Sequence, residues 1–465
     1  MTRGRHVLVA GGGITGLAAA LRLADEGVAV TLVEASDRLG GNIRTAPFGG
    51  VPVDEGADAF LARVPEGVEL CRRLGLGDSL VSPATSAASV VARGRVRRLP
   101  DGLVLGVPTS LRAVAESGVV SPAGAARAAL DLVRSDDWAG TDESIGAVMR
   151  RRLGDEVHEY LVDPLLGSIN AGDTDRLSLE SCAPQLADVV RRHRSIISGL
   201  REQRREQPAD PAAPVFHSLR RGMGQLVSAL EDELFRSPHV EIHRTTRVSE
   251  LAPRAGGTEV TLSDGRVLDA DGVVLAVPAG PAADAVASAS PRARPYLRQV
   301  ESASVVLVTF AFRRDAVAHP LDTSGLLVPR PEGRLMTACS FGSSKWPHWS
   351  LDPERVVLRA SAGRHGDERA LALDDDELVE ALLGELAELL GVSGDVLQWR
   401  VSRWPRSFPQ YAPGHAGRLA AAEDALARDL PGVLLAGASH RGIGIPACIR
   451  QGWQAADRLT AQAAA

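Results

Sequence analysis

Lysine is almost absent from this chain of 465 residues, because Lys345 is its only copy and arginine carries the remaining positive charge. Acidic side chains outnumber basic ones, and the net charge is −6. Proteins that bind nucleic acid through its phosphates need a basic surface, and this charge balance does not supply one. We therefore expect no nucleic-acid partner.

Cysteine is scarce as well, and its copies are widely separated. The four are Cys71, Cys182, Cys339 and Cys448. No two form a C-x-x-C pair, which excludes a dense disulfide framework and a dithiol redox centre. His239 and His243 alternate with apolar residues as in a strand, where four residues span about 13 Å, too far apart for one metal ion. We expect no metal site and a cytoplasmic protein.

Long apolar runs are missing too. No segment offers the roughly 20 consecutive apolar residues that a transmembrane helix requires. The apolar stretch near residues 7–24 is interrupted by glycines and Arg22, which argues against a signal peptide. The length of the chain predicts two or three lobes rather than one simple core.

A glycine-rich turn stands near the start of the chain, between a predicted strand and a predicted helix. The apolar run 7–10 is typical of a buried parallel strand, and Gly11, Gly13 and Gly16 follow it in G-x-G-x-x-G spacing. In this spacing the first glycine permits a tight turn, the second lets a pyrophosphate approach, and the third allows close helix packing. The N-terminus of the following helix offers free N–H groups to phosphates. The pattern predicts a dinucleotide site.

Glu34 narrows the choice of dinucleotide. It ends the second predicted strand, 18 residues after Gly16, where its carboxylate can accept hydrogen bonds from ribose hydroxyls. The same carboxylate repels a 2′-phosphate, which argues against NADP. A second glycine pair, Gly40 and Gly41, follows shortly afterwards.

The rest of the chain predicts an α/β fold whose dinucleotide domain is discontinuous and Rossmann-like. That domain comprises three pieces, 1–62, 217–284 and 415–465. A second domain with a mixed sheet, which we expect to bind the substrate, comprises two pieces, 63–109 and 285–414. Residues 110–216 are rich in Ala, Leu and Arg, show little strand character and predict a helical lobe that ends in a loop near 208–214.

The run from Gly11 to Thr45 resembles the opening of the FAD-dependent superfamily of amine oxidases, phytoene desaturases and protoporphyrinogen oxidases. In that superfamily an Arg-x-Gly-Gly stretch, here Arg38 to Gly41, lies beside the FAD phosphates. The resemblance implies FAD as the cofactor. The cofactor-binding residues that it implies are Gly11, Gly12, Gly13, Ile14, Thr15, Gly16, Glu34, Ala35, Arg38, Gly40, Gly41, Asn42, Gly56, Ala57, Asp58, Ala59, Val248, Gly437, Gly442, Ile443, Gly444 and Ile445.

Three later stretches resemble the protoporphyrinogen oxidases and the related coproporphyrinogen oxidases. These are residues 163–173, 408–415 and 436–452. The first is similar to a small-residue turn that lines the substrate cavity, and it implies Gly167, Ser168 and Ile169 as substrate contacts. Ser168 stands where the family pattern has a glycine. The third is similar to a motif over the flavin, in which we interpret Cys448 as a packed thiol rather than a covalent flavin link.

The resemblance implies oxygen-dependent, six-electron oxidation of coproporphyrinogen III to coproporphyrin III, with release of hydrogen peroxide, in porphyrin and heme biosynthesis. The flavin carries the redox chemistry, so no catalytic side chain is expected. Protoporphyrinogen IX oxidase, or another FAD-dependent amine oxidase or desaturase, is the alternative. Aromatic residues make up only 4% of the chain, which weakens the aromatic cage of an amine oxidase. A flavin-binding regulator is the non-enzymatic alternative.

The resemblance also implies partners: a tetrapyrrole substrate, molecular oxygen, and a ferrochelatase that receives the product. The substrate propionates are anions, so arginines are expected at the cavity mouth. Arg95 is a candidate, although an exposed strand explains the same alternating charges. Some family members carry a basic residue where Ala88 and Ser89 stand here. The helical lobe either contacts a membrane peripherally or presents an ordinary solvated surface.

Overall fold

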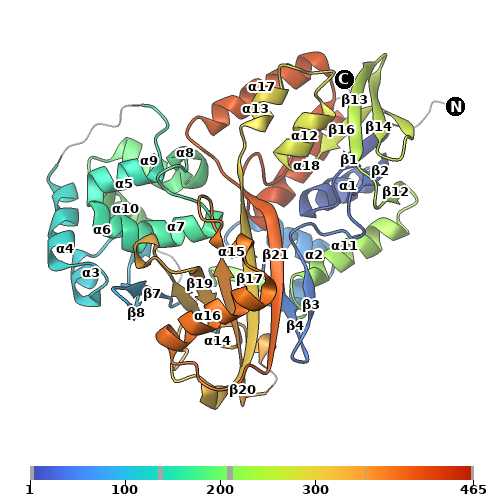
Figure 1. The fold of residues 1–465 in the computed structure, drawn as a ribbon. Helices are drawn as coiled ribbons and strands as arrows, with labels where there is room; N and C mark the ends of the chain where they lie inside the picture. The colour runs from blue at the N-terminus through green and yellow to red at the C-terminus, as the bar shows by residue number, and fades with distance from the viewer. Residues whose placement is uncertain (1–4, 135–139, 207–212, 351, 462–465) are drawn as a thin grey trace.

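The computed structural model describes residues 5–134, 140–206, 213–350 and 352–461. Most of the predicted loop at 208–214 lies outside these ranges. Figure 1 shows three regions: a group of helices on the left, a parallel sheet with its helices at the upper right, and a large sheet below the centre. The predicted α/β class is confirmed, whereas the domain boundaries given above stay a prediction.

The parallel sheet has five strands in the order β12-β2-β1-β16-β22. They are β1 (His6–Ala10), β2 (Ala29–Val33), β12 (Val240–His243), β16 (Gly272–Leu275) and β22 (Val433–Leu435). Three distant parts of the chain therefore meet in one sheet, as the discontinuous Rossmann-like prediction requires. Its central strands are buried on both faces, which explains why they are apolar runs without alternation.

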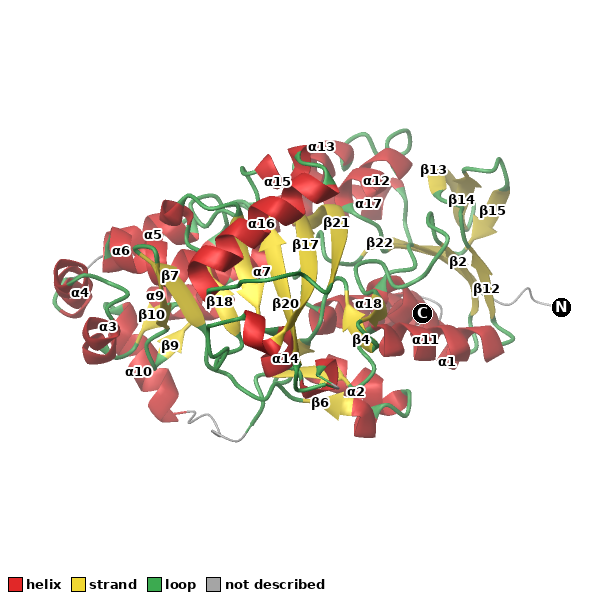
Figure 2. Cartoon of the chain, turned by 60° about the horizontal axis from the view of Figure 1, so that its bottom comes forward, coloured by secondary structure: helices red, strands yellow, loops and turns green. Residues whose placement is uncertain are grey.

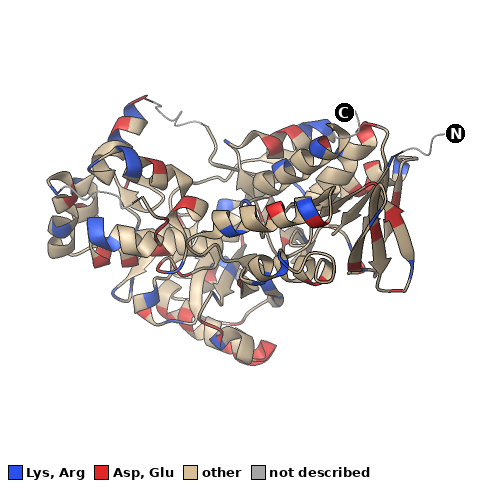
Figure 3. Cartoon of the chain, turned by 90° about the horizontal axis from the view of Figure 1, so that it is seen from above, with Lys and Arg blue, Asp and Glu red and all other residues tan. Residues whose placement is uncertain are grey.

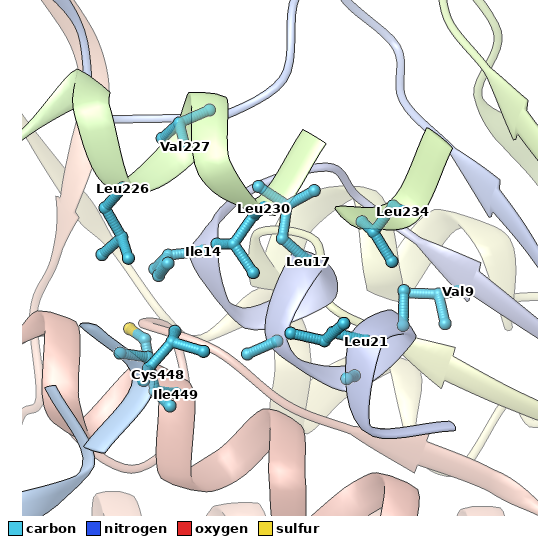
Figure 4. Close-up of a cluster of buried hydrophobic side chains, with 14 of the residues drawn as sticks. Val9, Ile14, Leu17, Leu21, Leu226, Val227, Leu230, Leu234, Cys448 and Ile449 are labelled. Carbon is cyan, nitrogen blue, oxygen red and sulfur yellow. The ribbon is translucent and has the colours of Figure 1, made fainter. Parts of the chain in front are cut away.

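Side chains that alternate along β1 enter two separate cores. Val7 and Val9 face a core formed with α1 (Ile14–Asp25), α11 (Gly224–Arg236) and α18 (Ile445–Ala461). Figure 4 shows α1 in this core, with side chains from α11 above it and from α18 below it.

Leu8 and Ala10 face the opposite core. Helices and an antiparallel sheet cover that side: α12 (Ala279–Ala285), α13 (Arg294–Arg298), α17 (His415–Asp429), β13 (Val248–Arg254), β14 (Gly257–Leu262) and β15 (Val267–Ala270). Strands β14 and β15 pair in antiparallel fashion and form a hairpin.

A seven-stranded mixed sheet has the order β21-β17-β20-β19-β18-β7-β8. Its strands are β7 (Ser89–Ala92), β8 (Arg95–Arg98), β17 (Ser302–Arg313), β18 (Gly325–Leu327), β19 (Met336–Ser340), β20 (Arg355–Ala362) and β21 (Gln398–Pro409). Only β18 and β7 pair in parallel. Helix α16 (Asp375–Leu390) crosses one face, as Figure 2 shows, and a capping box of Asp374 and Glu377 starts it. Short helices α14 (Gly342–Lys345) and α15 (Arg369–Ala372) connect strands of this sheet.

The region of residues 111–206 is helical, as predicted. Its helices are α3 (Leu111–Ser117), α4 (Pro122–Ala129), α5 (Ile145–Leu153), α6 (Asp155–Val157), α7 (Asp163–Asn170), α8 (Leu179–Cys182), α9 (Pro184–Arg192) and α10 (Ile196–Glu206). They enclose a core of their own. Within the stretch 163–173, Gly167, Ser168 and Ile169 belong to α7, and the small-residue turn follows the helix. The chain turns only at Ala171, whose φ is 44°.

The remaining short elements link these regions. They are β3 (Thr45–Phe48), β4 (Val51–Asp54), β5 (Phe60–Leu61), α2 (Pro65–Arg73), β6 (Leu80–Val81), β9 (Leu103–Val104), β10 (Val107–Pro108) and β11 (Phe216–Leu219). Strand β11 runs to Leu219, a turn at Gly222 follows it, and α11 begins at Gly224.

Charges and thiols are distributed as follows. Basic and acidic positions are interspersed along the helices (Figure 3). The four cysteines are free. Among the described helices, none combines the length and the hydrophobicity needed to cross a bilayer. In the same ranges, no three His, Cys, Asp or Glu side chains lie close enough together to hold a metal ion.

Candidate cofactor and substrate site

The first glycine turn is closely packed at two positions and open at a third. A Cβ at Gly11, whose φ is +103°, would lie 2.5 Å from the Ala276 carbonyl oxygen. A Cβ at Gly16 would lie 1.8 Å from the Gly11 oxygen, whereas a Cβ at Gly13 would meet nothing within 4 Å. Gly11 and Gly16 therefore allow the turn and helix α1 to pack, and Gly13 leaves bare backbone that a pyrophosphate can approach.

The second glycine pair lies directly against the first turn. The Gly40 N–H donates to the Gly12 oxygen at 2.8 Å, and a Cβ on Gly41 would lie 3.2 Å from the Gly13 Cα. The Arg38 guanidinium donates to the carbonyl oxygens of Leu39, Gly41 and Ile43. Burial lowers the pKa of Arg38. Arg38 therefore holds the second glycine pair in shape, so that both glycine segments form one surface.

Glu34 lies at the edge of this surface. One carboxylate oxygen accepts from the Gly12 N–H at 2.6 Å, and the other accepts from the N–H and hydroxyl of Ser36 at 2.8 and 2.7 Å. The backbone N–H of Thr246 donates to the Glu34 carbonyl oxygen at 2.9 Å. Ala35 is exposed beside Glu34, and Val248 begins β13 two residues after Thr246. The structure therefore brings these predicted residues to one end of the parallel sheet.

The C-terminal motif reaches the same surface from the other side. A Cβ on Gly437 would lie 3.5 Å from the hydroxyl of Thr15, and the Gln451 side chain accepts from the Gly437 N–H at 3.2 Å. The Tyr411 hydroxyl accepts from the Gly442 N–H at 2.9 Å and donates to the Ala438 carbonyl oxygen. Burial raises the pKa of Tyr411, so the hydroxyl stays protonated and able to donate.

These contacts hold the loop of Gly442, Ile443 and Gly444 over the N-terminus of α18, where Ile445 begins the helix. The sequence motifs predict no specific role for Gln451 or Tyr411. Both stand in stretches that carried the family resemblance, and this was the only signal for them in the sequence.

Residues 56–59 join the surface through Asn42. A Cβ on Gly56 would lie 2.3 Å from the Asn42 oxygen, which also accepts from the Ala57 N–H at 3.4 Å. Ala59 packs against a separate apolar cluster that includes Trp346. The loop that carries these residues is therefore set against the second glycine pair.

Asp58 has strong protein partners of its own. Its Oδ2 lies 3.1 Å from Lys345 Nζ, 3.1 Å from Arg359 Nη2 and 3.0 Å from Trp346 Nε1. Burial alone would raise the pKa of Asp58, but the charges of Lys345 and Arg359 outweigh it and hold the pKa well below its usual range. The only lysine of the chain thus belongs to a buried cluster of three charges, a role that its rarity in the sequence does not indicate.

The substrate candidates lie apart from the glycine surface. On α7, Gly167 is buried, Ser168 is exposed and Ile169 is half-exposed. The end of α7 is tied to the neighbourhood of Tyr411, because Gln410 Nε2 donates to the Asn170 oxygen at 2.9 Å. Arg95 is exposed on β8, the edge strand at the lower left of Figure 1, far from α1.

The sequence of this chain matches a known protein family over most of its length. Residues 14–460 match the family described as flavin containing amine oxidoreductase. The chain belongs to this family.

Relatives within the flavin containing amine oxidoreductases cover the whole chain. The coproporphyrinogen III oxidase of Bacillus subtilis (strain 168) is 36% identical over 98% of this chain and 98% of its own length. That of Mycobacterium leprae is 34% identical over 99% of each chain. A solved structure from Exiguobacterium sp. 255-15, proposed to be a protoporphyrinogen oxidase, has a TM-score of 0.87 and 30% identity, covering 99% of this chain and 100% of that one. The resemblance predicted from the motifs is confirmed.

The protein is therefore an FAD-dependent oxidoreductase, and the predicted cofactor is confirmed. The residues present fit FAD, because Gly13 offers open backbone beside the free N–H groups of α1 and Glu34 offers a carboxylate at the end of β2. The assignment of individual residues to parts of FAD stays a prediction.

Proposed function

We propose that this protein oxidises coproporphyrinogen III to coproporphyrin III with molecular oxygen as the electron acceptor. The observation that carries the proposal is full-length similarity, at 36% and 34% identity, to proteins named coproporphyrinogen III oxidase. The glycine surface and the candidate substrate helix α7, tied together through Gln410 and Tyr411, support it.

The reaction removes six electrons and six protons from the macrocycle, and three molecules of oxygen become three of hydrogen peroxide. FAD, when bound, supplies the electron acceptance, and the protein supplies orientation and a dry environment. In this proposal Gly11–Gly16, Arg38–Asn42 and Glu34 hold the pyrophosphate and ribose side of the cofactor. Residues 56–59 and 437–445 hold the flavin side.

A mostly buried apolar cluster near the end of α7, called the apolar wall below, is the surface that we propose for the hydrophobic macrocycle. Ala171, Ala303 and Val305 form it, with Trp404 and Phe408 packed against them. In the proposed reaction these side chains exclude water from the face of the ring that loses hydrogen. Gly167, Ser168 and Ile169 line the same end of α7 as the proposed substrate contacts.

The cellular setting is part of the same proposal. We infer a cytoplasmic enzyme that passes its product to a ferrochelatase, since the product is a porphyrin ready for metal insertion. Contact of the helical region with a membrane surface is the open alternative to a fully solvated surface, and flotation with liposomes separates the two.

An aerobic assay of the purified holoprotein tests the proposed reaction. Porphyrin fluorescence and hydrogen peroxide are followed together, with coproporphyrinogen III and protoporphyrinogen IX as parallel substrates. We expect about one peroxide for each pair of electrons and a higher kcat/KM for coproporphyrinogen III. A strong preference for protoporphyrinogen IX would establish the alternative suggested by the Exiguobacterium structure, and no oxidation of either substrate would refute both.

A further inference from the structure

Two arginines meet where the seven-stranded sheet approaches the end of α7. Arg330 follows β18 and Arg364 follows β20. Arg330 Nη2 donates to the Gly172 carbonyl oxygen at 2.7 Å and to that of His365 at 3.5 Å. Because His365 follows Arg364 directly, the Arg330 guanidinium lies against the peptide next to Arg364.

Among the described residues, the carboxylates nearby are paired with other groups and form no ion pair with Arg364. Asp163 Oδ2 lies 3.6 Å from Arg330 Nε, which is a long ion pair, and Asp367 is bound in bidentate fashion by Arg369 at 2.8 Å on each side. Asp175 and Glu301 belong to the same neighbourhood, but Asp175 is bound by Arg150 and Glu301 lies 2.7 Å from His365 Nε2. In the described part of the chain, the Arg364 side chain has no hydrogen-bond or ion-pair partner, and its Nε is buried.

The environment of Arg364 agrees with an uncompensated charge. Burial lowers the pKa of Arg364 and the charge of Arg330 lowers it further, whereas the charges of Asp163 and Asp367 offset only part of this shift. An arginine that stays charged in such a place is stabilised most effectively by an anion with two oxygens, since a carboxylate matches the planar guanidinium.

The arginine pair lies at the end of the proposed substrate region. The His365 N–H donates to the Ala171 oxygen at 2.8 Å, so both arginine segments contact the turn after α7. From Ala171 the apolar wall runs to Trp404, which donates to the Glu55 oxygen at 2.7 Å. The Trp404 ring would lie 3.1 Å from a Cβ on Gly56, within the stretch predicted to bind FAD.

We propose that Arg364, with Arg330 beside it, binds a propionate carboxylate of the substrate while the macrocycle lies along the apolar wall. This inference rests on the proposed function and gives its site a cationic anchor for an anionic substrate group, well away from Arg95. It also gives a physical reason to prefer a substrate with more propionates, because additional ring positions can present a carboxylate to the pair.

The test compares Arg364→Gln with wild type, both as holoenzymes. Binding of coproporphyrin III and of its uncharged tetramethyl ester is followed by fluorescence titration in one buffer. Loss of a charge-assisted pair should weaken binding of the acid by about tenfold to a hundredfold and leave ester binding unchanged. The KM for coproporphyrinogen III should rise by a similar factor, with kcat nearly constant.

Arg313→Gln is the matched control. Arg313 is an exposed arginine at the end of β17 that pairs with Asp315, so its replacement should leave both affinities at the wild-type value. Arg364→Lys keeps the positive charge but lacks the planar guanidinium, and it should bind the acid with intermediate affinity. If the glutamine variant folds poorly, the lysine variant still tests the site.

The outcomes separate this inference from the proposed function. The first outcome is that the wild type oxidises coproporphyrinogen III and Arg364→Gln binds the acid as tightly as the wild type does. This outcome leaves the proposed function standing and overturns the arginine site. An equal loss of acid and ester binding shows a structural effect and also overturns it. A wild-type protein that neither binds coproporphyrin III nor oxidises coproporphyrinogen III overturns the proposed function as well.

Discussion

At the scale of single residues, Asp54 shows how burial sets the chemistry of a side chain. Its Oδ1 accepts from the Thr45 hydroxyl at 2.5 Å and from the Met223 N–H at 2.8 Å. Its Oδ2 is buried without a partner. Burial raises the pKa of Asp54 from 3.8 to about 7. This carboxyl group therefore joins the β3–β4 hairpin to the start of α11 and titrates near neutrality.

Asp54→Asn should alter how stability depends on pH. The folded state binds this proton more tightly than the unfolded state, so the contribution of Asp54 is greatest below pH 4 and is lost as the pH rises towards 7. Asparagine does not titrate. The free energy of unfolding of the variant, relative to wild type, should therefore increase between pH 4 and pH 7.5 in denaturant titrations. Asp101→Asn, at an exposed site, should run parallel to wild type, and parallel curves for Asp54→Asn would contradict the prediction.

At the scale of elements, the crossing of α1 and α18 depends on one missing side chain. A Cβ at Gly452 would lie 2.4 Å from the Thr15 oxygen and 3.1 Å from the Ala19 nitrogen. Both are backbone atoms, so neither can rotate away. Since α18 follows directly on the loop of residues 437–445, the distance between these helices also sets the position of that loop.

Gly452→Ala should therefore separate the two helices. We expect a loss of about 1–3 kcal/mol in the free energy of unfolding, together with weaker FAD binding. Gly384→Ala in α16 is the matched control, because a Cβ there meets nothing within 4 Å. Alanine at that position should stabilise by about 0.5–1 kcal/mol through helix propensity. Chemical denaturation measures the free energy of unfolding of both variants. Equal changes in the two variants would contradict the conclusion that Gly452 allows α1 and α18 to approach closely.

At the scale of the whole molecule, Arg359 joins the seven-stranded sheet to the cofactor region. It projects from β20, donates to the carbonyl oxygens of Asp54 and Gly56 at 2.9 and 3.2 Å, and pairs with Asp58 at 3.1 Å. Its side chain is only 10% exposed. One guanidinium thus connects parts of the chain some three hundred residues apart.

Arg359→Met should leave Asp58 buried with Lys345 as its remaining cation. Breaking a buried pair in this way costs about 3–5 kcal/mol. Arg355→Met, in the same strand, removes an exposed ion pair with Asp352 and should change the free energy of unfolding by less than about 0.5 kcal/mol. Thermal or urea unfolding measures both variants. Similar stabilities for the two would show that the buried cluster does not join the regions.

The local parts of the fold could be predicted from the sequence because their signals lie within a few residues of one another. The turn at Gly11, the helix after it and Glu34 follow from backbone geometry that each residue imposes on its neighbours. Strands β16 and β22 are likewise short apolar runs in the sequence. The small residues of 163–173 indicated a turn but not its first residue, because Gly167 and Ser168 continue α7 and the chain turns only at Ala171.

The sequence by itself therefore determined a discontinuous dinucleotide fold, FAD and the family. Tertiary structure alone decided which charges meet: Asp58 with Lys345 and Arg359, and Arg330 with Arg364 at the end of α7. The physical reason is the distance along the chain over which each kind of interaction acts. Glycine turns and strand patterns act through adjacent backbone, whereas the partner of a buried charge is whichever side chain the packed sheets bring within a few ångströms, at any distance along the chain.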